Sequence, residues 1–371
     1  MVLIDSADFL GSNEPINSMI RTWIAVYFLH HVNLISFSAI DTRHFARDIL
    51  RASRGEDIND QEVKVNLPFN AYVKQAIYLC TTPRGIDTAY QVTPRLRASE
   101  TRITFLLRNL AIVIREYFIL DLLTSLVFFS APKKRFLVGR SEYFNDIGHI
   151  TGRGILINRG IAVFNMVSKS VWFMDMYYRI ASMLFVGLRL SRPYQWPPLF
   201  GSIKEAYTVR RFWRDYWFQS FRWPVAGIAK VFLSQFVCWP FESDGKRLLY
   251  LIARFTIIAG YYWGLEEYLG FFYPHSRIWL FLLCQPIGII IEDAVEVLYR
   301  VVRVRCRYNS TREGTLQHSA MKILGYLWVV GFFYMTLPLD KIPIVIRTEL
   351  AKDGVPISVI RFVYGYMTGH S

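Results

Sequence analysis

The chain has 371 residues, of which 53% are hydrophobic and 16% aromatic, whereas only 19% are charged, and its mean hydropathy is +0.24. Globular chains usually carry about 25% charged residues, so this composition argues against an ordinary soluble protein. The formal net charge is +14. We attribute this charge to membrane topology, because cytoplasmic loops collect Lys and Arg, and we expect no nucleic-acid partner.

Apolar runs recur along the chain, and the longest reach the roughly 20 residues that cross the hydrocarbon core of a bilayer. In chain order they cover residues 22–40, 70–80, 117–131, 171–188, 223–241, 251–272, 278–298 and 323–339. The first two are the weakest, because polar residues interrupt them. The runs predict an all-α, polytopic integral membrane protein with roughly 6–8 transmembrane helices.

Charged segments separate these runs. Residues 43–66 carry both charge signs at high density, and residues 132–159 combine basic residues with glycines. We expect an N-terminal membrane segment and charged loop at 1–66, a main membrane domain at 67–350 and a tail at 351–371. The N-terminus has neither the basic start nor the apolar core of a cleavable signal peptide, so we expect none.

Two arginine clusters set the expected orientation. They lie at 204–222 and 299–312, and we expect both on the cytoplasmic side. Three apolar runs lie between them, whereas an even number of crossings is required. We therefore expect 223–241, which is flanked by prolines and contains Lys230, to be re-entrant or interfacial.

The residues that commonly bind metals do not form a metal-binding pattern. Only His30 and His31 are neighbouring histidines, and we interpret them as structural, because adjacent helical residues point to different faces. The four cysteines lack a CxxC spacing, which argues against a zinc site or a disulfide framework. The acidic cluster at 292–296 has no partner motif that would hold magnesium diphosphate. We interpret it as a helix end in which Glu296 pairs with Arg300, and we expect no metal.

The segment FWRDYWFQSFRWP, residues 212–224, combines aromatic rings with arginines directly after the breaker-rich stretch RPYQWPPLFGS, residues 192–202. A buried helix would not carry the arginines, and an exposed loop would not carry the rings. We expect this segment to lie at a boundary between water and an apolar phase, where aromatic residues are enriched.

Three motifs resemble those of the membrane-bound O-acyltransferase superfamily, in its fungal wax-synthase-domain branch. PPLFGSIKEAYTVRRFWRDYWFQSFR (197–222) resembles the family's PPLFGS…AYTLRxFWGxxWHQxxR motif. TTPRGIDTAYQV (81–92) resembles its PRGIGTxWxV box, and GIIIEDAVEVLYR (288–300) resembles its GIxxEDxVxxLxR helix. The likeness runs from about residue 75 to 345 with the motifs in the family's order.

The resemblance implies helices around a tunnel that joins a cytosolic acyl-CoA entrance to a lipid-side acceptor entrance. It implies transfer of an acyl group from acyl-CoA, as co-substrate and with no further cofactor, to the hydroxyl of a hydrophobic alcohol. That acceptor would be a fatty alcohol, a sterol or a terpenoid secondary metabolite. The implied location is a membrane, that of the endoplasmic reticulum, in contact with membrane lipid.

Arginines suit the phosphates of CoA, because they form forked, charge-assisted hydrogen bonds. The residues that the resemblance assigns to acyl-CoA or substrate binding are Arg210, Arg211, Trp213, Arg214, Asp215, Trp217, Gln219 and Arg222. The alternative stays open that the arginines only follow the positive-inside bias.

Two positions depart from the family's pattern. Phe218 stands where the motif has histidine or asparagine, and Trp263 stands where an intramembrane histidine is expected. Tryptophan cannot accept a proton at neutral pH, so the general base would have to be another group. The candidates are Glu266, Glu267 and His275.

Other interpretations of these residues stay open. The two glutamates also fit the watery end of a span, and His275 fits an interfacial loop. The chain would then be a catalytically silent homologue that binds lipid or a partner, and a small-molecule transporter is a third alternative. Asp121 and Asp175 lie inside apolar runs, where we expect them to hydrogen-bond between helices.

Overall fold

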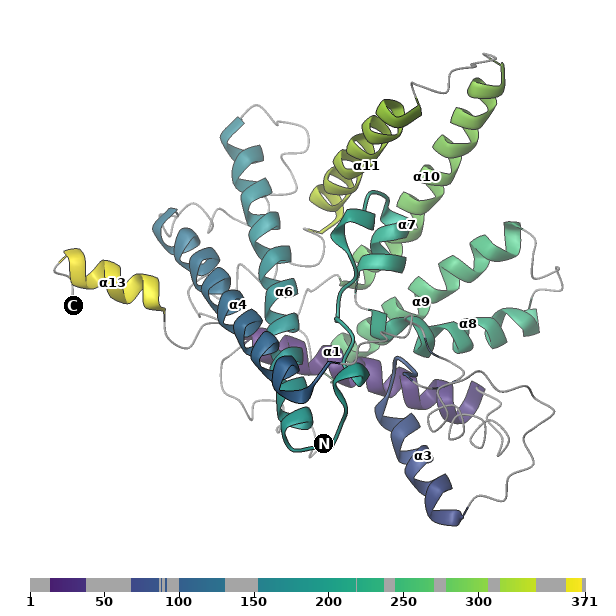
Figure 1. Cartoon of the computed structure of the whole chain (residues 1–371). Helices are drawn as coiled ribbons and strands as arrows, with labels where there is room; N and C mark the ends of the chain where they lie inside the picture. The colour runs from purple at the N-terminus through teal and green to yellow at the C-terminus, as the bar shows by residue number, and fades with distance from the viewer. Residues whose placement is uncertain are drawn as a thin grey trace.

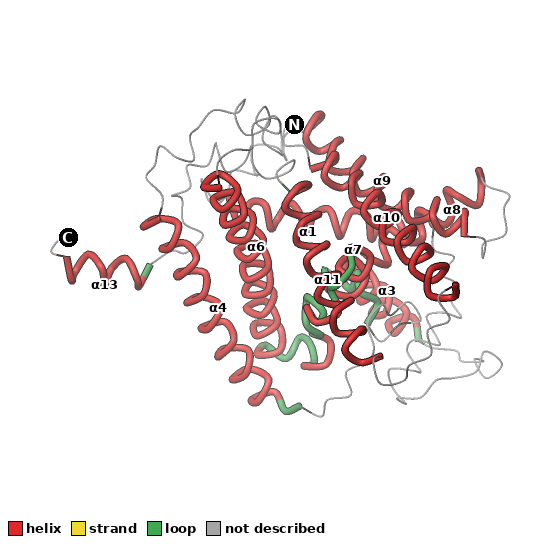
Figure 2. The backbone as a smooth tube through the Cα atoms, turned by 90° about the horizontal axis from the view of Figure 1, so that it is seen from above, coloured by secondary structure: helices red, strands yellow, loops and turns green. Residues whose placement is uncertain are grey.

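The computed structural model describes eleven parts of the chain. They are residues 14–37, 68–86, 88, 91, 100–130, 153–217, 219–236, 244–269, 278–305, 314–337 and 358–368. These parts contain helices and turns and no strand (Figure 2). The predicted all-α class is therefore confirmed for the described residues.

The longer helices match the apolar runs. They are α1 (Glu14–Val32), α3 (Phe69–Thr81), α4 (Arg102–Ser130), α6 (Arg153–Gly187), α8 (Arg222–Phe236), α9 (Asp244–Leu269), α10 (Ile278–Arg305), α11 (Gly314–Thr336) and α13 (Val359–Thr368). Each of the eight predicted runs overlaps one of the first eight helices, and α13 lies at the edge of the molecule, where it contacts α4 (Figure 1).

Two described helical segments are long and apolar enough to cross a bilayer, namely Ile278–Val302 and Ser319–Thr336. The count of roughly six to eight spans stays a prediction. Helix α8 has 15 residues and so rises about 22 Å, which is less than the roughly 30 Å of hydrocarbon in a bilayer. Residues 237–241 lie outside the described residues, so the re-entrant or interfacial placement of 223–241 stays a prediction.

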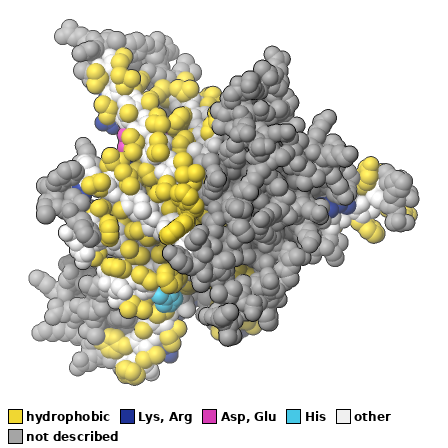
Figure 3. Space-filling model, turned by 180° about the vertical axis from the view of Figure 1, so that it is seen from behind, with side chains coloured by type: hydrophobic (Ala, Val, Ile, Leu, Met, Phe, Trp, Pro, Cys, Tyr) yellow, Lys and Arg dark blue, Asp and Glu magenta, His cyan; other side chains and the backbone are white. Residues whose placement is uncertain are grey.

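The outward faces of the helices are apolar. On α4 the exposed side chains include Ile103, Leu107, Leu110, Ile114, Phe118 and Leu122, which recur every three or four residues along one face. Helices α10 and α11 expose similar rows, and Figure 3 shows apolar side chains over much of the described surface seen from behind. Water-soluble monomers rarely expose continuous apolar areas of this kind, whereas lipid solvates them.

The described helices pack in two groups. Helix α4 packs along α6, while α8, α9 and α10 pack side by side (Figure 1). Helix α1 contacts α3, α6 and α8 and so connects the groups. The main apolar core lies between α9, α10 and α11 and includes Ala259, Tyr262, Phe281 and Ile289.

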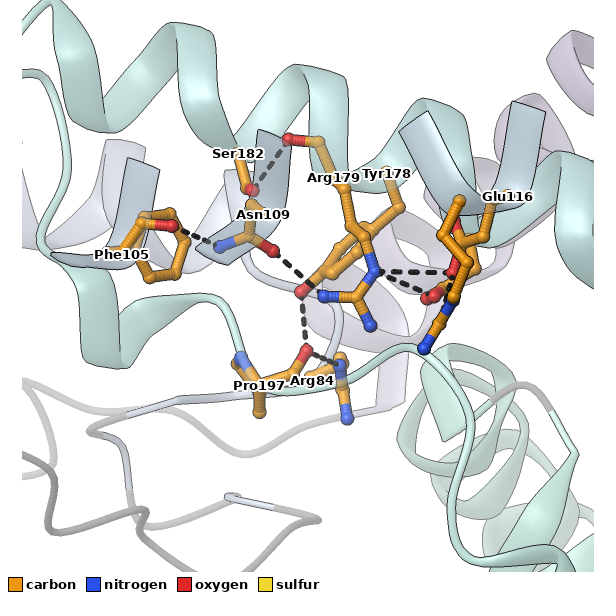
Figure 4. Close-up of polar contacts among 10 residues, drawn as sticks. Arg84, Phe105, Asn109, Glu116, Tyr178, Arg179, Ser182 and Pro197 are labelled. Carbon is orange, nitrogen blue, oxygen red and sulfur yellow. Dashed lines mark hydrogen bonds and ion pairs between the residues drawn. The ribbon is translucent and has the colours of Figure 1, made fainter. Parts of the chain in front are cut away.

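A buried polar network joins α4 to α6 (Figure 4). Arg179 donates to Asp175 at 2.7 Å and to Asn109 of α4 at 2.8 Å. The Arg179 guanidinium also lies 3.7 Å from the carboxylate of Glu116, a residue of α4 that is fully buried. Asp175 itself bonds to Arg179 of the same helix, and Arg179 makes the contact with α4, so a hydrogen bond of Asp175 between helices stays a prediction.

Asp121 bonds between helices, and this prediction is confirmed. Its carboxylate accepts hydrogen bonds from the Ser358 hydroxyl and, at 3.0 Å, from the backbone N–H of Ile360. Ile360 lies in the first turn of α13, where backbone N–H groups have no partner within the helix. Asp121 on α4 therefore caps α13.

Candidate functional site

The aromatic–basic segment, residues 196–222, is an irregular connection between α6 and α8. It passes through a 3-10 turn at Ile203–Glu205, α7 (Val209–Arg211), a π-helical turn at Phe212–Tyr216 and a second 3-10 turn at Gln219–Phe221. Thr208 precedes α7, and its side chain accepts a hydrogen bond of 3.0 Å from the backbone N–H of Arg211. Single π-turns occur frequently at functional sites.

Arg84 attaches the 81–92 motif to this segment. Its guanidinium donates hydrogen bonds of 3.0 and 2.9 Å to the backbone carbonyls of Pro197 and Pro198, and the residue is only 5% exposed. The hydroxyl of Tyr178 donates to the same Pro197 carbonyl at 2.8 Å (Figure 4). Gly85 has a φ of 58°, a conformation that glycine adopts without strain, so the turn after Arg84 requires it.

We expect Arg84→Lys to destabilise the fold. Lysine has one compact ammonium group and cannot reproduce the forked contact with two carbonyls. Buried carbonyls that lose their donors cost about 1–3 kcal/mol each. Thermal unfolding of the purified protein should show a clear decrease in melting temperature.

Arg300→Lys is the matched control for Arg84→Lys. Arg300 is exposed and pairs with Glu296 on the surface of α10, so its replacement should leave the melting temperature nearly unchanged. Equal stability of the two variants would contradict the anchoring role of Arg84.

Glu292 attaches the 288–300 motif to the same segment. Its carboxylate accepts hydrogen bonds from the backbone N–H groups of Val209 and, at 3.1 Å, Arg210. The indole N–H of Trp328 on α11 donates to it at 2.9 Å. The carboxylate thus satisfies N–H groups at the start of α7, where no partner exists within the helix. The next residue, Asp293, forms an ion pair with Arg210.

The interpretation of 292–296 as a helix end is wrong. Helix α10 continues to Arg305, so Glu292 and Asp293 lie well inside it. The predicted pair of Glu296 with Arg300 is confirmed. The first two acids were misinterpreted because their partners lie 82 and 83 residues earlier in the chain.

Gly201 brings the PPLFGS stretch against the π-turn. A Cβ atom at this position would lie 1.8 Å from the carbonyl oxygen of Asp215, and the Gly201 N–H donates to the Tyr216 carbonyl at 2.9 Å. Real Cβ atoms do not approach backbone atoms so closely. The contact therefore requires glycine.

We expect Gly201→Ala to push the PPLFGS stretch away from the π-turn. The free energy of unfolding should fall by at least about 1–3 kcal/mol. Gly260→Ala in α9 is the control, because a Cβ there meets no atom within 4 Å and alanine favours helix over glycine. Thermal unfolding of both variants measures the difference. A Gly201→Ala protein as stable as Gly260→Ala would contradict the close approach.

The aromatic residues of the segment pack inward. Trp213 contacts the main core, and its indole N–H donates to the side chain of buried Gln285 at 3.0 Å. The rings of Phe212 and Trp217 stack with centroids 5.5 Å apart. Gln219 donates to the carbonyls of Arg214 and Trp217 at 2.9 and 3.1 Å, which closes the π-turn. Trp213, Trp217 and Gln219 thus maintain the shape of the segment.

Three of the four predicted arginines already have acidic partners. Arg210 pairs with Asp293, Arg211 with Glu205 at 2.8 Å, and Arg214 with Asp215 at 2.8 Å. The hydrogen bonds from Arg214 hold the pKa of Asp215 below its usual range, so Asp215 is ionised at neutral pH and its charge offsets that of Arg214.

Arg222 differs from these three. It is exposed at the start of α8, and among the described residues no carboxylate lies within ion-pair distance of it. Arg254 of α9 and Asp215 of the π-turn both lie close enough to interact with it electrostatically. Arg222 is thus exposed and, within the described part of the chain, is not held in an ion pair.

Comparison with known proteins gives a consistent result. Residues 196–282 match the model of the "Membrane bound O-acyl transferase family". Acetyltransferase ataH of Aspergillus terreus is 32% identical over 309 residues, which are 80% of this chain and 97% of that protein. The chain belongs to the membrane bound O-acyl transferase family.

More distant relatives cover most of the chain as well. Acetyltransferase TRI7 of Fusarium sporotrichioides is 29% identical over 330 residues, which are 85% of this chain and 70% of the relative. Acetyltransferase cdmC of Talaromyces verruculosus is 24% identical over 356 residues, 91% and 77% of the two chains. No solved structure matches. Family membership and the two apolar helices make this protein a membrane protein.

The side chains of the predicted catalytic residues lie outside the part of the chain that the structure describes. Glu266 and Glu267 belong to α9, but their side chains are not described, and His275 and Phe218 lie outside the described residues. Trp263 is 45% exposed, whereas Tyr262, which is 6% exposed, belongs to the main core. The position matched to the family histidine therefore faces away from the core.

Sequence reasoning missed the anchoring roles of Arg84 and Glu292. Both residues lie in motifs that were recognised, PRG and ED, but the motifs do not show what the side chains contact. Both are charged residues in otherwise apolar or turn-forming stretches. This pattern could have identified them, since buried charged groups require partners.

Proposed function

We propose that this protein transfers an acyl group from acyl-CoA to the hydroxyl of a hydrophobic acceptor. The observation that carries the proposal is the meeting of three family motifs at one segment, through Arg84 and Glu292. These contacts hold residues 196–222 in a fixed irregular conformation. The family assignment supports acyl transfer as the general activity.

The acyl group in this proposal is acetyl. The relatives that this chain matches over most of their length are acetyltransferases by name. Acetyl is the smallest acyl group that CoA commonly carries in such transfers. The acceptor belongs to the hydrophobic alcohols, which include fatty alcohols, sterols and terpenoid secondary metabolites. The proposal includes no metal and no further cofactor, and it places the protein in the endoplasmic reticulum membrane.

The reaction requires three contributions from the chain. A cationic group binds the CoA phosphates, and a helical enclosure holds the acceptor hydroxyl near the thioester carbonyl. A base removes the hydroxyl proton as the oxygen attacks that carbonyl. Arg222 is the described cation best suited to the first role, because Arg210, Arg211 and Arg214 already face carboxylates.

One observation favours a second function, that of a catalytically silent homologue which binds lipid or a partner. The usual histidine positions hold Phe218 and Trp263, and Trp263 faces away from the core. A silent homologue would bind acyl-CoA or lipid without turnover.

Product formation separates the two functions. Purified protein in lipid nanodiscs is incubated with labelled acetyl-CoA and a panel of fatty, sterol and terpenoid alcohols, and acetyl esters are detected by mass spectrometry. Acyl transfer predicts an acetyl ester of at least one acceptor class. Saturable binding of acetyl-CoA without any ester would support the silent homologue.

A further inference from the structure

The C-terminal end of α1 brings a histidine against the start of α8, directly after the aromatic–basic segment. His30 is 0% exposed, and its ring lies 5.1 Å, centroid to centroid, from the ring of Trp223 at the start of α8. Nearby, the side-chain amide of Asn33 donates to the Trp223 carbonyl at 3.4 Å. His30 thus lies deep in the protein, directly beside the motif that carries the family signature.

The contacts of His30 determine its tautomer. Its Nε2 lies 2.7 Å from the backbone carbonyl of Leu79, two residues before the 81–92 motif. Because a carbonyl only accepts hydrogen bonds, Nε2 must carry a proton, and in the neutral imidazole Nδ1 then holds the lone pair. The Nδ1 atom is buried and has no hydrogen-bond partner among the described residues. A neutral imidazole in this state can accept a proton.

Two more buried polar atoms lie on the adjoining elements. The Asn33 Oδ1 atom and the Ser220 Oγ atom are buried and also lack partners among the residues that the structure describes. The turn Gln219–Phe221 that contains Ser220 contacts both α1 and α8. An unpaired buried polar atom costs about 1–3 kcal/mol, so a hydroxyl bound beside His30 Nδ1 and Ser220 Oγ would remove part of this cost.

The side chain of Asn33 packs closely against Gly227 of α8. A Cβ atom at Gly227 of α8 would lie 1.9 Å from Asn33 Oδ1, so only glycine leaves room for this amide. The fold therefore keeps a polar side chain between α1 and α8 at a position that an apolar residue could have filled.

We propose that His30 is the general base of acyl transfer, and that the acceptor hydroxyl binds between His30 and Ser220. This inference rests on the proposed function. The acceptor O–H donates its proton to His30 Nδ1 while its oxygen forms a bond to the acyl carbon. The carbon–sulfur bond then breaks, the CoA thiolate leaves, and it takes the proton back from the imidazolium. The net products are an ester and free CoA.

The neighbouring histidine provides a matched control. His31 lies on another face of α1 and is partly exposed, and its Nδ1 lies 2.6 Å from the Tyr27 carbonyl within the same helix. Its ring therefore has a hydrogen-bond partner within α1.

The test compares His30→Gln, His31→Gln and wild-type protein in the acetyl-transfer assay. Glutamine can still donate to the Leu79 carbonyl but has no basic nitrogen. We expect His30→Gln to lose about 10²–10⁴-fold in kcat with an unchanged KM for acetyl-CoA, and His31→Gln to resemble the wild type. Free imidazole should restore part of the activity of His30→Ala, which a purely structural role would not allow.

Each outcome decides the inference. If folded His30→Gln retains wild-type activity, His30 is not the base, and acyl transfer by the protein still stands. The same holds if activity is lost in Glu266→Gln, Glu267→Gln or His275→Gln but not in His30→Gln. Absence of transfer by the wild type overturns both. If His30→Gln does not fold, Ser220→Ala must raise the acceptor KM about tenfold without affecting acetyl-CoA, and an unchanged acceptor KM overturns the inference.

Discussion

The Glu292→Gln variant is expected to lose stability and about a hundredfold in turnover. The glutamine oxygen can replace one carboxylate oxygen, but its NH₂ group then faces a backbone N–H, because Glu292 accepts from Val209 on one oxygen and from Arg210 on the other. Two donors in contact leave both unsatisfied, and each unsatisfied group costs about 1–3 kcal/mol. A small displacement of the segment would cost about 10²-fold in rate.

Thermal unfolding and acetyl transfer measure the two effects separately. Glu296→Gln is the control on the same helix, because Glu296 and its partner Arg300 are both exposed and an exposed pair contributes at most about 1 kcal/mol. If Glu292→Gln were as stable as Glu296→Gln, the anchoring of α7 by Glu292 would be contradicted, whatever the activity of the protein.

The Arg222→Ala variant is expected to weaken acetyl-CoA binding about ten- to a hundredfold. A hydrogen bond between charged groups contributes about 1.5–3 kcal/mol, and the charge of Arg222 is not offset by a carboxylate within ion-pair distance in the described part of the chain. Its neighbour Arg254 lies over the ring of Tyr250 at 5.7 Å and adds positive potential, while Asp215, which is paired with Arg214, adds negative potential. Calorimetry with acetyl-CoA measures the affinity.

Arg211→Ala provides the comparison. Arg211 faces Glu205 and lies 4.5 Å from the centroid of the Tyr207 ring, so its removal should change the affinity far less than Arg222→Ala. Equal weakening by Arg222→Ala and Arg211→Ala would show that the ion pairs open for CoA. Unchanged affinity in Arg210→Ala, Arg211→Ala, Arg214→Ala and Arg222→Ala together would leave the arginines with a topological role alone.

The helices could be predicted from the sequence because their signal is local. Apolar runs near 278–298 and 323–339 identify α10 and α11 without knowledge of their neighbours. The attachments of the aromatic–basic segment could not be predicted in this way. Arg84 contacts a carbonyl 113 residues away, and Glu292 contacts an amide 83 residues away. Only the packing of the whole chain brings these groups together.

The candidate base illustrates the same limit. The motif match pointed to Trp263, but one residue along a helix turns the side chain by about 100°, and the core-facing residue is Tyr262. His30 was interpreted as structural because it and His31 point to different faces of a helix and no other histidine lies near them in the sequence. The ring of Trp223, which contacts His30 at the start of α8, is 193 positions further along the chain.

The measurement that tests the central claim most directly is transfer of labelled acetyl from acetyl-CoA by the purified protein in nanodiscs, with Glu292→Gln as the matched variant. We predict that wild-type protein forms an acetyl ester of a hydrophobic alcohol together with an equal amount of free CoA, and that Glu292→Gln forms about a hundredfold less. Wild-type protein that binds acetyl-CoA but forms no ester with any alcohol of the panel would contradict the assignment of this chain as an acyltransferase.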